Sequence, residues 1–158
     1  MSRAIVLHPG DVACGERGDR LETLLGSCIA IVLTDPRRTV GTMCHVVHTG
    51  ESDGGRGAAD SHYGQAALQS MFRQLVARGI TPRLCQAYVY GGGNMFPALM
   101  RGGHVGERNA RWARDALEAA GVRVLVHDVG GSAYRKLAWT IGPGDPEVRA
   151  MPVQEEAQ

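Results

Sequence analysis

The sequence predicts a layered α/β domain, and three observations support this interpretation. The chain has 158 residues, which is the usual length of one domain and enough to bury a core without disulfide or metal support. Several short apolar runs rich in β-branched residues are typical of strands. Two longer stretches repeat apolar residues at helical spacing. Strands and amphipathic helices that follow one another along a chain indicate layered packing.

The first half of the chain is predicted to be mainly strands. Residues 4–7 and 11–14 form two short strands around the turn "HPGD". Residues 28–34, "CIAIVLT", are the strongest strand because they are apolar, short and β-branched. The turn "DPRR" follows, since Asp-Pro favours turn initiation, and residues 39–47 form the returning strand.

A loop and a helix come next. Residues 48–60 are polar and rich in glycine, which is typical of a mobile surface loop. Asp60 or Ser61 is expected to cap a helix that ends before Gly79 at the C′ position. The apolar positions of this helix are Ala67, Leu68, Met71, Leu75 and Val76.

The second half is predicted to alternate strands and a helix. "RLCQAYVYGGGNMF" is a strand that runs into a glycine turn, and "GERNARWARDALEAAG" is a helix closed by Gly121. "VRVLVHDV" and "RKLAWTI" are strands separated by "GGSAY". We expect one domain over residues 1–150, with a chain that frays after "GPGDPE" and a flexible tail at 151–158.

Composition excludes several classes of function. The formal net charge is +1 and only 5% of residues are aromatic, so neither a basic nucleic-acid footprint nor a base-stacking surface is expected. The N-terminus shows no signal-peptide pattern and no apolar run is long enough to span a bilayer, so we expect a cytoplasmic protein without membrane insertion. The four cysteines lack CxxC spacing, so a structural zinc site is not expected.

The turn "DPRR" suggests how one cysteine is placed. If residues 35–38 form a four-residue hairpin loop, Thr34 pairs with Thr39 and Cys28 lies directly opposite His45. Cys44 and Ser27 then point to the other face of the sheet. A bulge at Gly41 would shift this register.

A thiol beside an imidazole has two interpretations. A histidine can take the proton of a thiol whose ordinary pKa is about 8.5, and the thiolate then attacks a carbonyl carbon. Backbone N–H groups near Gly26 and Ser27 would stabilise the oxyanion that forms. The alternative is a small buried thiol beside a hydrogen-bonded histidine, without catalysis.

Five segments of the sequence resemble a known protein family. The segments "TLLGSCIAIVLTDPRRTVGTMCH", "YGQAAL", "YGGGNMF", "VGERNARWARDAL" and "HDVGGSAYRKL" occur in this order. Together they resemble the bacterial chemoreceptor glutamine deamidase family, CheD. The resemblance runs from about residue 5 to residue 145, which is nearly the whole chain.

The resemblance implies a three-layer α/β sandwich with mixed and antiparallel sheets and two main helices. It implies hydrolysis of selected glutamines of chemotaxis receptors to glutamate; some members also remove methyl esters, and some bind a chemotaxis phosphatase, CheC. Carried over by position, Cys28 resembles the nucleophile, His45 the base and Thr23 the third member. In some members that threonine stands six places before the cysteine, where this chain has Glu22.

We therefore interpret the chain as a protein-glutamine amidohydrolase that acts through a thioester on Cys28, a chemistry that requires no metal or cofactor. The glycines of "YGGGNMF" lack nucleotide-loop spacing and are expected to form a tight turn, with Asn94 near the substrate amide. The loop 48–60 is expected to form one rim of an open cleft. Two alternatives remain: an adaptor that binds chemoreceptor helices or a CheC-type phosphatase with little catalysis, and an acyltransferase to an amine.

Overall fold

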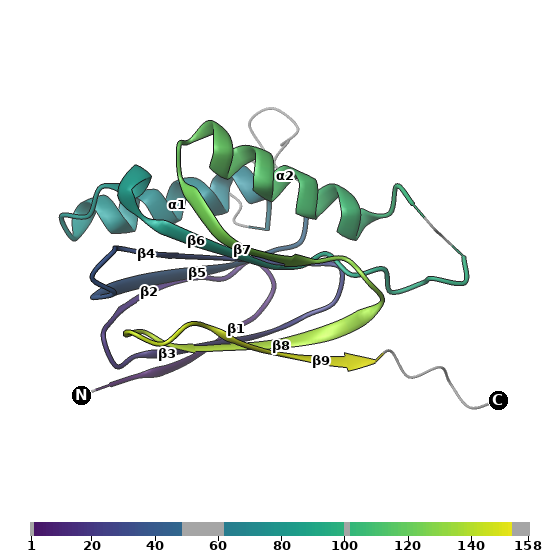
Figure 1. The fold of residues 1–158 in the computed structure, drawn as a ribbon, viewed down its shortest axis with the longest axis horizontal. Coiled ribbons are helices and arrows are strands. Elements are labelled where there is room, and N and C mark those ends of the chain that lie inside the picture. The colour runs from purple at the N-terminus through teal and green to yellow at the C-terminus, as the bar shows by residue number, and fades with distance from the viewer. Residues whose placement is uncertain (1, 49–61, 100–101, 153–158) are drawn as a thin grey trace.

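The computed structural model describes residues 2–48, 62–99 and 102–152, which form three layers (Figure 1). Helices α1 (Gly64–Ala77) and α2 (Val105–Ala119) cover one face of a five-stranded sheet. A four-stranded sheet packs on the opposite face of that sheet. The predicted α/β class, with mixed and antiparallel sheets and two main helices, is confirmed.

The five-stranded sheet has the order β2-β5-β4-β6-β7. Its strands are β2 (Val12–Glu16), β5 (Val40–Val46), β4 (Ile29–Thr34), β6 (Gln86–Gly91) and β7 (Arg123–Val129). Only β6 and β7 pair in parallel, because α2 carries the chain back across the sheet between them. A short 3-10 helix, η1 (Pro82–Leu84), leads into β6.

The four-stranded sheet has the order β1-β3-β8-β9, from β1 (Ala4–Leu7), β3 (Arg20–Leu25), β8 (Ala133–Thr140) and β9 (Glu147–Pro152). Strand β3 was not predicted. Its residues nevertheless alternate, with Leu21, Thr23 and Leu25 buried between the sheets and Leu24 exposed on the outer face. This alternation with a period of two is typical of a half-buried strand, and it is the feature of the sequence from which β3 could have been predicted.

The expectation that the chain frays after "GPGDPE" is wrong for residues 147–152. These residues form β9, which pairs antiparallel with β8 along its whole length. Most of β9 is exposed because it is an edge strand with one neighbour. Polar composition therefore does not distinguish an edge strand from a free tail, and residues 153–158 lie outside the described residues.

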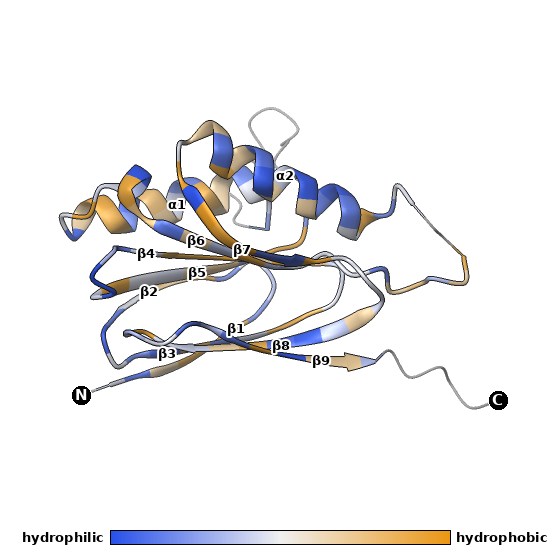
Figure 2. Ribbon diagram, in the orientation of Figure 1, coloured by the Kyte–Doolittle hydropathy of each residue, from blue (hydrophilic) through white to orange (hydrophobic). Residues whose placement is uncertain are grey.

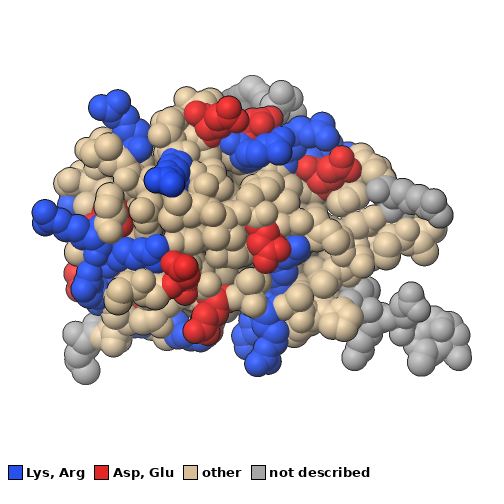
Figure 3. Space-filling view, in the orientation of Figure 1, with Lys and Arg blue, Asp and Glu red and all other residues tan. Residues whose placement is uncertain are grey.

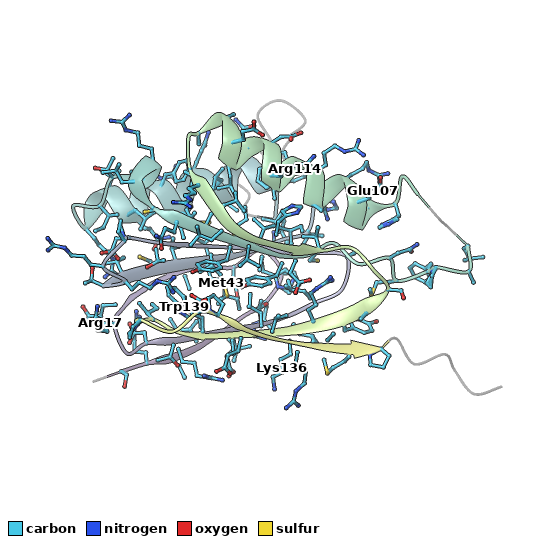
Figure 4. All side chains as sticks on the ribbon, viewed as in Figure 1. Arg17, Met43, Glu107, Arg114, Lys136 and Trp139 are labelled. Carbon is cyan, nitrogen blue, oxygen red and sulfur yellow. The ribbon has the colours of Figure 1, made fainter. Side chains whose placement is uncertain are left out.

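Strand β4 lies at the centre of the packing, and both of its faces are buried. Ile29, Ile31 and Leu33 pack toward the helices, whereas Ala30 and Val32 pack toward the second sheet. A strand covered on both faces is apolar throughout, as the run "CIAIVLT" is. Figure 2 shows this apolar colouring along the middle layer. Met43 and Trp139 fill the space between the sheets (Figure 4).

The helix ends are only partly as predicted. Helix α1 begins at Gly64 with Tyr63 at the N-cap, so the cap is neither Asp60 nor Ser61, both of which lie outside the described residues. Gly79 is confirmed at C′, with φ +80°, and the next N–H, of Ile80, reaches back to the carbonyl of Leu75 at 2.9 Å.

The two helices also differ from expectation in single side chains. Val76, predicted on the buried face of α1, is 60% exposed. Helix α2 is capped by His104, whose Nδ1 accepts from the N–H of Glu107, while the Glu107 carboxylate accepts from the N–H of Gly103. This reciprocal arrangement resembles a capping box in which an imidazole replaces the usual hydroxyl. Gly121, with φ +72°, closes α2 as predicted.

Candidate active site

The hairpin between β4 and β5 has a different register from the predicted one. Thr34 pairs with Gly41 rather than Thr39, and His45 lies opposite Ala30 rather than Cys28. The connecting loop is longer because the Asp35 carboxylate accepts hydrogen bonds from the N–H groups of Thr39 and Val40 at 2.8 and 2.9 Å. Arg38 takes a left-handed conformation, with φ 56°, inside this loop.

The shift of two residues leaves Cys28 and His45 on the same face. Cys28 stands two residues before Ala30, in the bend just before β4, so its thiol is displaced along the strand direction from His45 instead of lying directly opposite it. The His45 imidazole contacts Thr23 of β3, so it lies on the face toward the second sheet. Cys28 packs, half-buried, against the cluster between the sheets, and His45 is 3% exposed.

Thr23 reaches His45 from the opposite sheet. Its Oγ1 lies 2.7 Å from His45 Nδ1 and 2.8 Å from the carbonyl oxygen of Leu7. A carbonyl only accepts, so the single hydroxyl proton goes to Leu7, and Nδ1–H must donate to Oγ1. This assignment leaves Nε2 without a proton and available as a base. Glu22, the alternative position, instead pairs with Arg20 at 2.8 Å.

The backbone of His45 is fixed by the turn "HPGD". The N–H of His45 donates to the carbonyl of Asp11 at 3.0 Å, and the carbonyl of His45 accepts from the N–H of Gly10 at 2.9 Å. The predicted turn therefore positions the imidazole in addition to reversing the chain.

Burial keeps both members of the pair uncharged. It lowers the pKa of His45 to about 4, with the Asp11 carboxylate opposing the shift. It also raises the pKa of the Cys28 thiol. At neutral pH the resting site thus holds a thiol and a neutral imidazole, so the proton must move as the sulfur attacks.

The buried imidazole predicts a pH-dependent stability. Its pKa falls from the ordinary 6.5 to about 4 on folding, so between these values the unfolded chain binds a proton that the native chain does not. Stability is therefore retained above pH 6.5 and lost as pH falls toward 4, by about 3 kcal/mol. Urea unfolding at pH 7 and pH 4 measures this, and His45→Asn should show a loss smaller by that amount. Equal losses in both proteins would contradict it.

The glycine turn after β6 supports the backbone at Cys28. A Cβ on Gly91, with φ +113°, would lie 2.2 Å from the carbonyl oxygen of Cys28, so only glycine fits there. The N–H groups of Gly92 and Gly93 donate to the carbonyls of Cys28 and Gly26, each at 2.9 Å. The predicted tight turn is thus confirmed, and it lies against the thiol-bearing segment.

Hydrogen bonds in the structure bear on two more predictions: the oxyanion donors next to Ser27 and the role of Asn94. Within the described part of the chain, the N–H groups of Ser27 and Cys28 donate no hydrogen bond, which leaves them available to a substrate oxygen. The Oδ1 of Asn94 accepts from the N–H of Phe96 at 3.0 Å, so this oxygen stabilises its own turn. A contact of Asn94 with substrate remains a prediction.

Cys44 does not compete as the nucleophile. It is fully buried on the helix side of the five-stranded sheet, opposite the face of Cys28. Burial raises the pKa of Cys44 to about 12. The predicted orientation away from the site is confirmed for this thiol.

Sequence reasoning missed two polar residues next to the site. Arg135, 8% exposed, donates to the carbonyl of Gly91 at 3.2 Å and pairs with Asp128. Asn109 on α2 donates to the carbonyls of Ser27 and Val47. Two signals in the sequence could have pointed to them: an arginine in the predicted strand "RKLAWTI", and an asparagine on the buried side of the second helix.

An apolar hollow opens beside Gly26. A Cβ on Gly26 would lie 3.0 Å from the sulfur of Met95. Met95 also lines a cavity of about 430 Å³, together with Phe96, Pro97, Ala98, Leu99, Ser132, Ala133 and Pro152. Phe96 is 66% exposed and Leu99 82% exposed. The expected rim at 48–60 lies, except for His48, outside the described residues.

Comparison with known proteins shows which family this chain belongs to. The model of the family described as CheD, chemotactic sensory transduction, matches residues 48–150. A probable chemoreceptor glutamine deamidase CheD 3 of Dechloromonas aromatica is 35% identical over 89% of this chain and 84% of its own length. The chain belongs to the CheD family. The resemblance seen in the sequence is therefore confirmed.

Other CheD relatives cover the candidate site as well. The probable chemoreceptor glutamine deamidase CheD of Pseudomonas syringae is 33% identical over 95% of this chain and 86% of its own length. A probable chemoreceptor glutamine deamidase CheD of Methanococcus vannielii is 32% identical over 89% of this chain and 90% of its own length. Each alignment leaves out at most about a tenth of this chain, so the aligned part includes Thr23, Cys28 and His45.

The surface of this CheD chain carries mixed charge. On the face shown in Figure 3, lysine and arginine alternate with aspartate and glutamate, so no single-sign field covers it. Over residues 2–48, 62–99 and 102–152, neither helix has the length and apolar character needed to cross a bilayer.

Proposed function

We propose that this chain is a protein-glutamine amidohydrolase that converts glutamines of chemotaxis receptors to glutamate and releases ammonia. The observation that carries the proposal is the arrangement of Cys28, His45 and Thr23, in which a thiol and an imidazole share one face and a hydroxyl holds Nδ1 at 2.7 Å. The relatives from Dechloromonas aromatica and Pseudomonas syringae are named probable chemoreceptor glutamine deamidases, which supports the same substrate class.

The first half of the reaction forms a thioester. The Cys28 sulfur attacks the side-chain amide carbon of the glutamine while its proton passes to Nε2 of His45. The amide oxygen becomes an oxyanion, which the N–H groups of Cys28 and Ser27 stabilise. As the oxyanion collapses, the imidazolium protonates the departing nitrogen, and ammonia leaves.

The second half hydrolyses the thioester. Neutral His45 takes a proton from water, and the resulting hydroxide attacks the acyl carbon. Collapse breaks the C–S bond, and the Cys28 sulfur recovers its proton from the imidazolium. The products are a glutamate side chain and the starting enzyme, so the net reaction consumes one water for each ammonia released.

The surface near the site supports a protein substrate. Phe96 and Leu99 expose large apolar side chains around the hollow next to Gly26. Exposed apolar patches mark interaction sites, protein contacts among them. An open, shallow surface also suits a glutamine that projects from the side of a receptor helix.

Ammonia release from a purified receptor cytoplasmic fragment tests the proposal. Wild-type protein should release ammonia without an added amine and raise the fragment mass by about 1 Da per glutamine, as hydrolysis of an amide requires. Turnover only with an added amine would identify an acyltransferase. Binding of the fragment without turnover would replace the enzyme with the adaptor.

Thr23 is proposed as the residue that orients the imidazole. Thr23→Val keeps the shape but leaves Nδ1–H buried without an acceptor, at a cost of about 1–3 kcal/mol, so kcat should fall about 10- to 100-fold. Thr23→Ser retains the hydroxyl and should keep most activity. Ammonia release by the two variants under saturating receptor fragment measures the difference, and equal activity of both would show that the hydroxyl has no role.

Three features remain predictions, the first two from the resemblance and the third from the absence of a signal-peptide pattern and of a bilayer-length apolar run in the sequence. These are a CheC-type phosphatase as a binding partner, removal of receptor methyl esters and a cytoplasmic location. Each has its own measurement: pull-down with a purified CheC-type phosphatase, methanol release from a methylated receptor fragment, and fractionation of the producing cell.

A further inference from the structure

Asn109 connects helix α2 to both strand ends that carry the candidate site. Its side chain is fully buried, and its Nδ2 donates to the carbonyl oxygens of Ser27 and Val47, each at 3.1 Å. Ser27 directly precedes Cys28, and Val47 follows His45 by two residues. One amide group thus joins the segment of the thiol to the segment of the imidazole.

The orientation of this amide is determined by its partners. Both acceptors are carbonyl oxygens, so the nitrogen with its two hydrogens must face them, and a flipped amide would set three oxygens against one another. Oδ1 is then buried without a partner among the described residues. A buried acceptor without a partner is costly, and native proteins rarely keep one without a functional reason.

All three carbonyl groups of the segment from Gly26 to Cys28 accept hydrogen bonds. The carbonyls of Gly26 and Cys28 accept from the glycine turn at 2.9 Å, and the carbonyl of Ser27 between them accepts from Asn109. Helix α2 also presses on this turn, since a Cβ on Gly106 would lie 2.5 Å from the carbonyl oxygens at positions 92 and 93. Helix α2 therefore holds the carbonyl of Ser27 directly and packs against the turn that holds the other two.

Planarity of the peptide bond converts this support into an orientation of N–H groups. The carbonyl of Ser27 and the N–H of Cys28 belong to one trans peptide unit, in which the two groups point in opposite directions. Asn109 holds the oxygen, so it also directs the Cys28 N–H away from α2. That N–H donates no hydrogen bond to the described residues and remains available to an oxyanion.

We propose that Asn109 is a positioning residue that orients the Cys28 N–H as a donor of the oxyanion hole. This rests on the proposed thioester chemistry, but it concerns a residue that takes no part in proton transfer. Without Asn109 the peptide between Ser27 and Cys28 loses the hydrogen bond to its oxygen, so the direction of its N–H is less firmly held. The thiol and the imidazole stay in place, so only steps that develop an oxyanion should suffer.

Two small reagents can test whether only steps that develop an oxyanion suffer, without a receptor. Acylation of Cys28 by 4-nitrophenyl acetate passes through an oxyanion, whereas alkylation by iodoacetamide displaces iodide and develops none. In Asn109→Leu, acylation of Cys28 should slow about 10²-fold, the effect of losing one oxyanion donor, with alkylation within about twofold of wild type. Reaction at Cys28 is assigned by peptide mass mapping, with Cys28→Ala as the blank.

Leu117→Ala is the matched control, because Leu117 is a fully buried residue eight positions further along the same helix and has no polar group to hold a carbonyl. It should lower Tm yet leave the ratio of acylation to alkylation unchanged at a temperature where it is folded. Equal slowing of both reactions in Asn109→Leu, or no slowing of acylation, would overturn the proposal.

Deamidation kinetics provide the second readout. With the receptor fragment, Asn109→Leu should lower kcat about 10²-fold and leave KM within about threefold, because the oxyanion donor acts in the transition state. A wild-type protein that releases no ammonia would refute the proposed function, and the acylation ratio would still decide the role of Asn109. An unchanged kcat in an active wild-type background would refute the role of Asn109 alone.

Discussion

Replacing Cys28 by alanine is expected to lower ammonia release from a receptor fragment by about 10⁴-fold or more, the scale seen when a catalytic nucleophile is removed. Cys28 is the half-buried thiol on the face of His45, whereas Cys14, Cys44 and Cys85 are buried. Without the sulfur no thioester can form, and water must attack the amide directly. Ammonia release together with the mass of the receptor fragment measures this loss.

Cys44→Ala provides the matched control for the thiol. Cys44 faces the helices, so its removal should leave kcat within about threefold of wild type. Acid quenching during turnover should trap the receptor fragment on wild-type and Cys44→Ala protein by a covalent bond, and on Cys28→Ala not at all. Loss of turnover in Cys44→Ala with an intact fold would show that Cys28 is not the nucleophile.

The second large effect is expected at His45. His45→Asn places an amide N–H where Nδ1–H lies, so the hydrogen bond to Thr23 is kept while the base at Nε2 is removed. Loss of a general acid-base group costs about 10²- to 10⁴-fold, and we expect kcat for deamidation to fall by this factor. Steady-state ammonia release at pH 7 measures it.

The pH profile separates this role from a structural one. The pKa of His45 is about 4, so wild-type activity should not fall through protonation of the base between pH 8 and pH 6. A rate that declines with an apparent pKa near 6.5 would mean that the working base is a different, exposed histidine. His48 is the nearest such residue in sequence, exposed two residues beyond the end of β5.

The hairpin illustrates how much of the site was accessible from sequence. The register of β4 and β5 was wrong by two residues, because Asp35 organises a longer loop than the turn "DPRR" indicates. The shared face of Cys28 and His45 was nevertheless correct. Side chains alternate with a period of two, so a shift of two residues changes which residues oppose one another but not the face on which they lie.

The resemblance named Thr23, but its contact with His45 required the tertiary structure. Thr23 contacts His45 across the gap between two sheets, and strand β3 itself was not predicted. Spacing along the chain does not reveal this contact, because it depends on how two separate sheets stack. The same holds for Asn109, which lies 82 positions beyond Ser27 in sequence and meets it only because α2 packs over the end of the sheet.

The sequence by itself determined the α/β class, the closing glycines of both helices, the buried strand β4 and the face that carries thiol and imidazole. These features follow from local periodicity and from the conformational freedom of glycine, which act over a few residues. The tertiary structure alone decided the register of the hairpin, the tautomer of His45, its burial and the support from Thr23 and Asn109. Those features depend on packing between distant segments, where hydrogen-bond partners and desolvation are set by neighbours that no local pattern specifies.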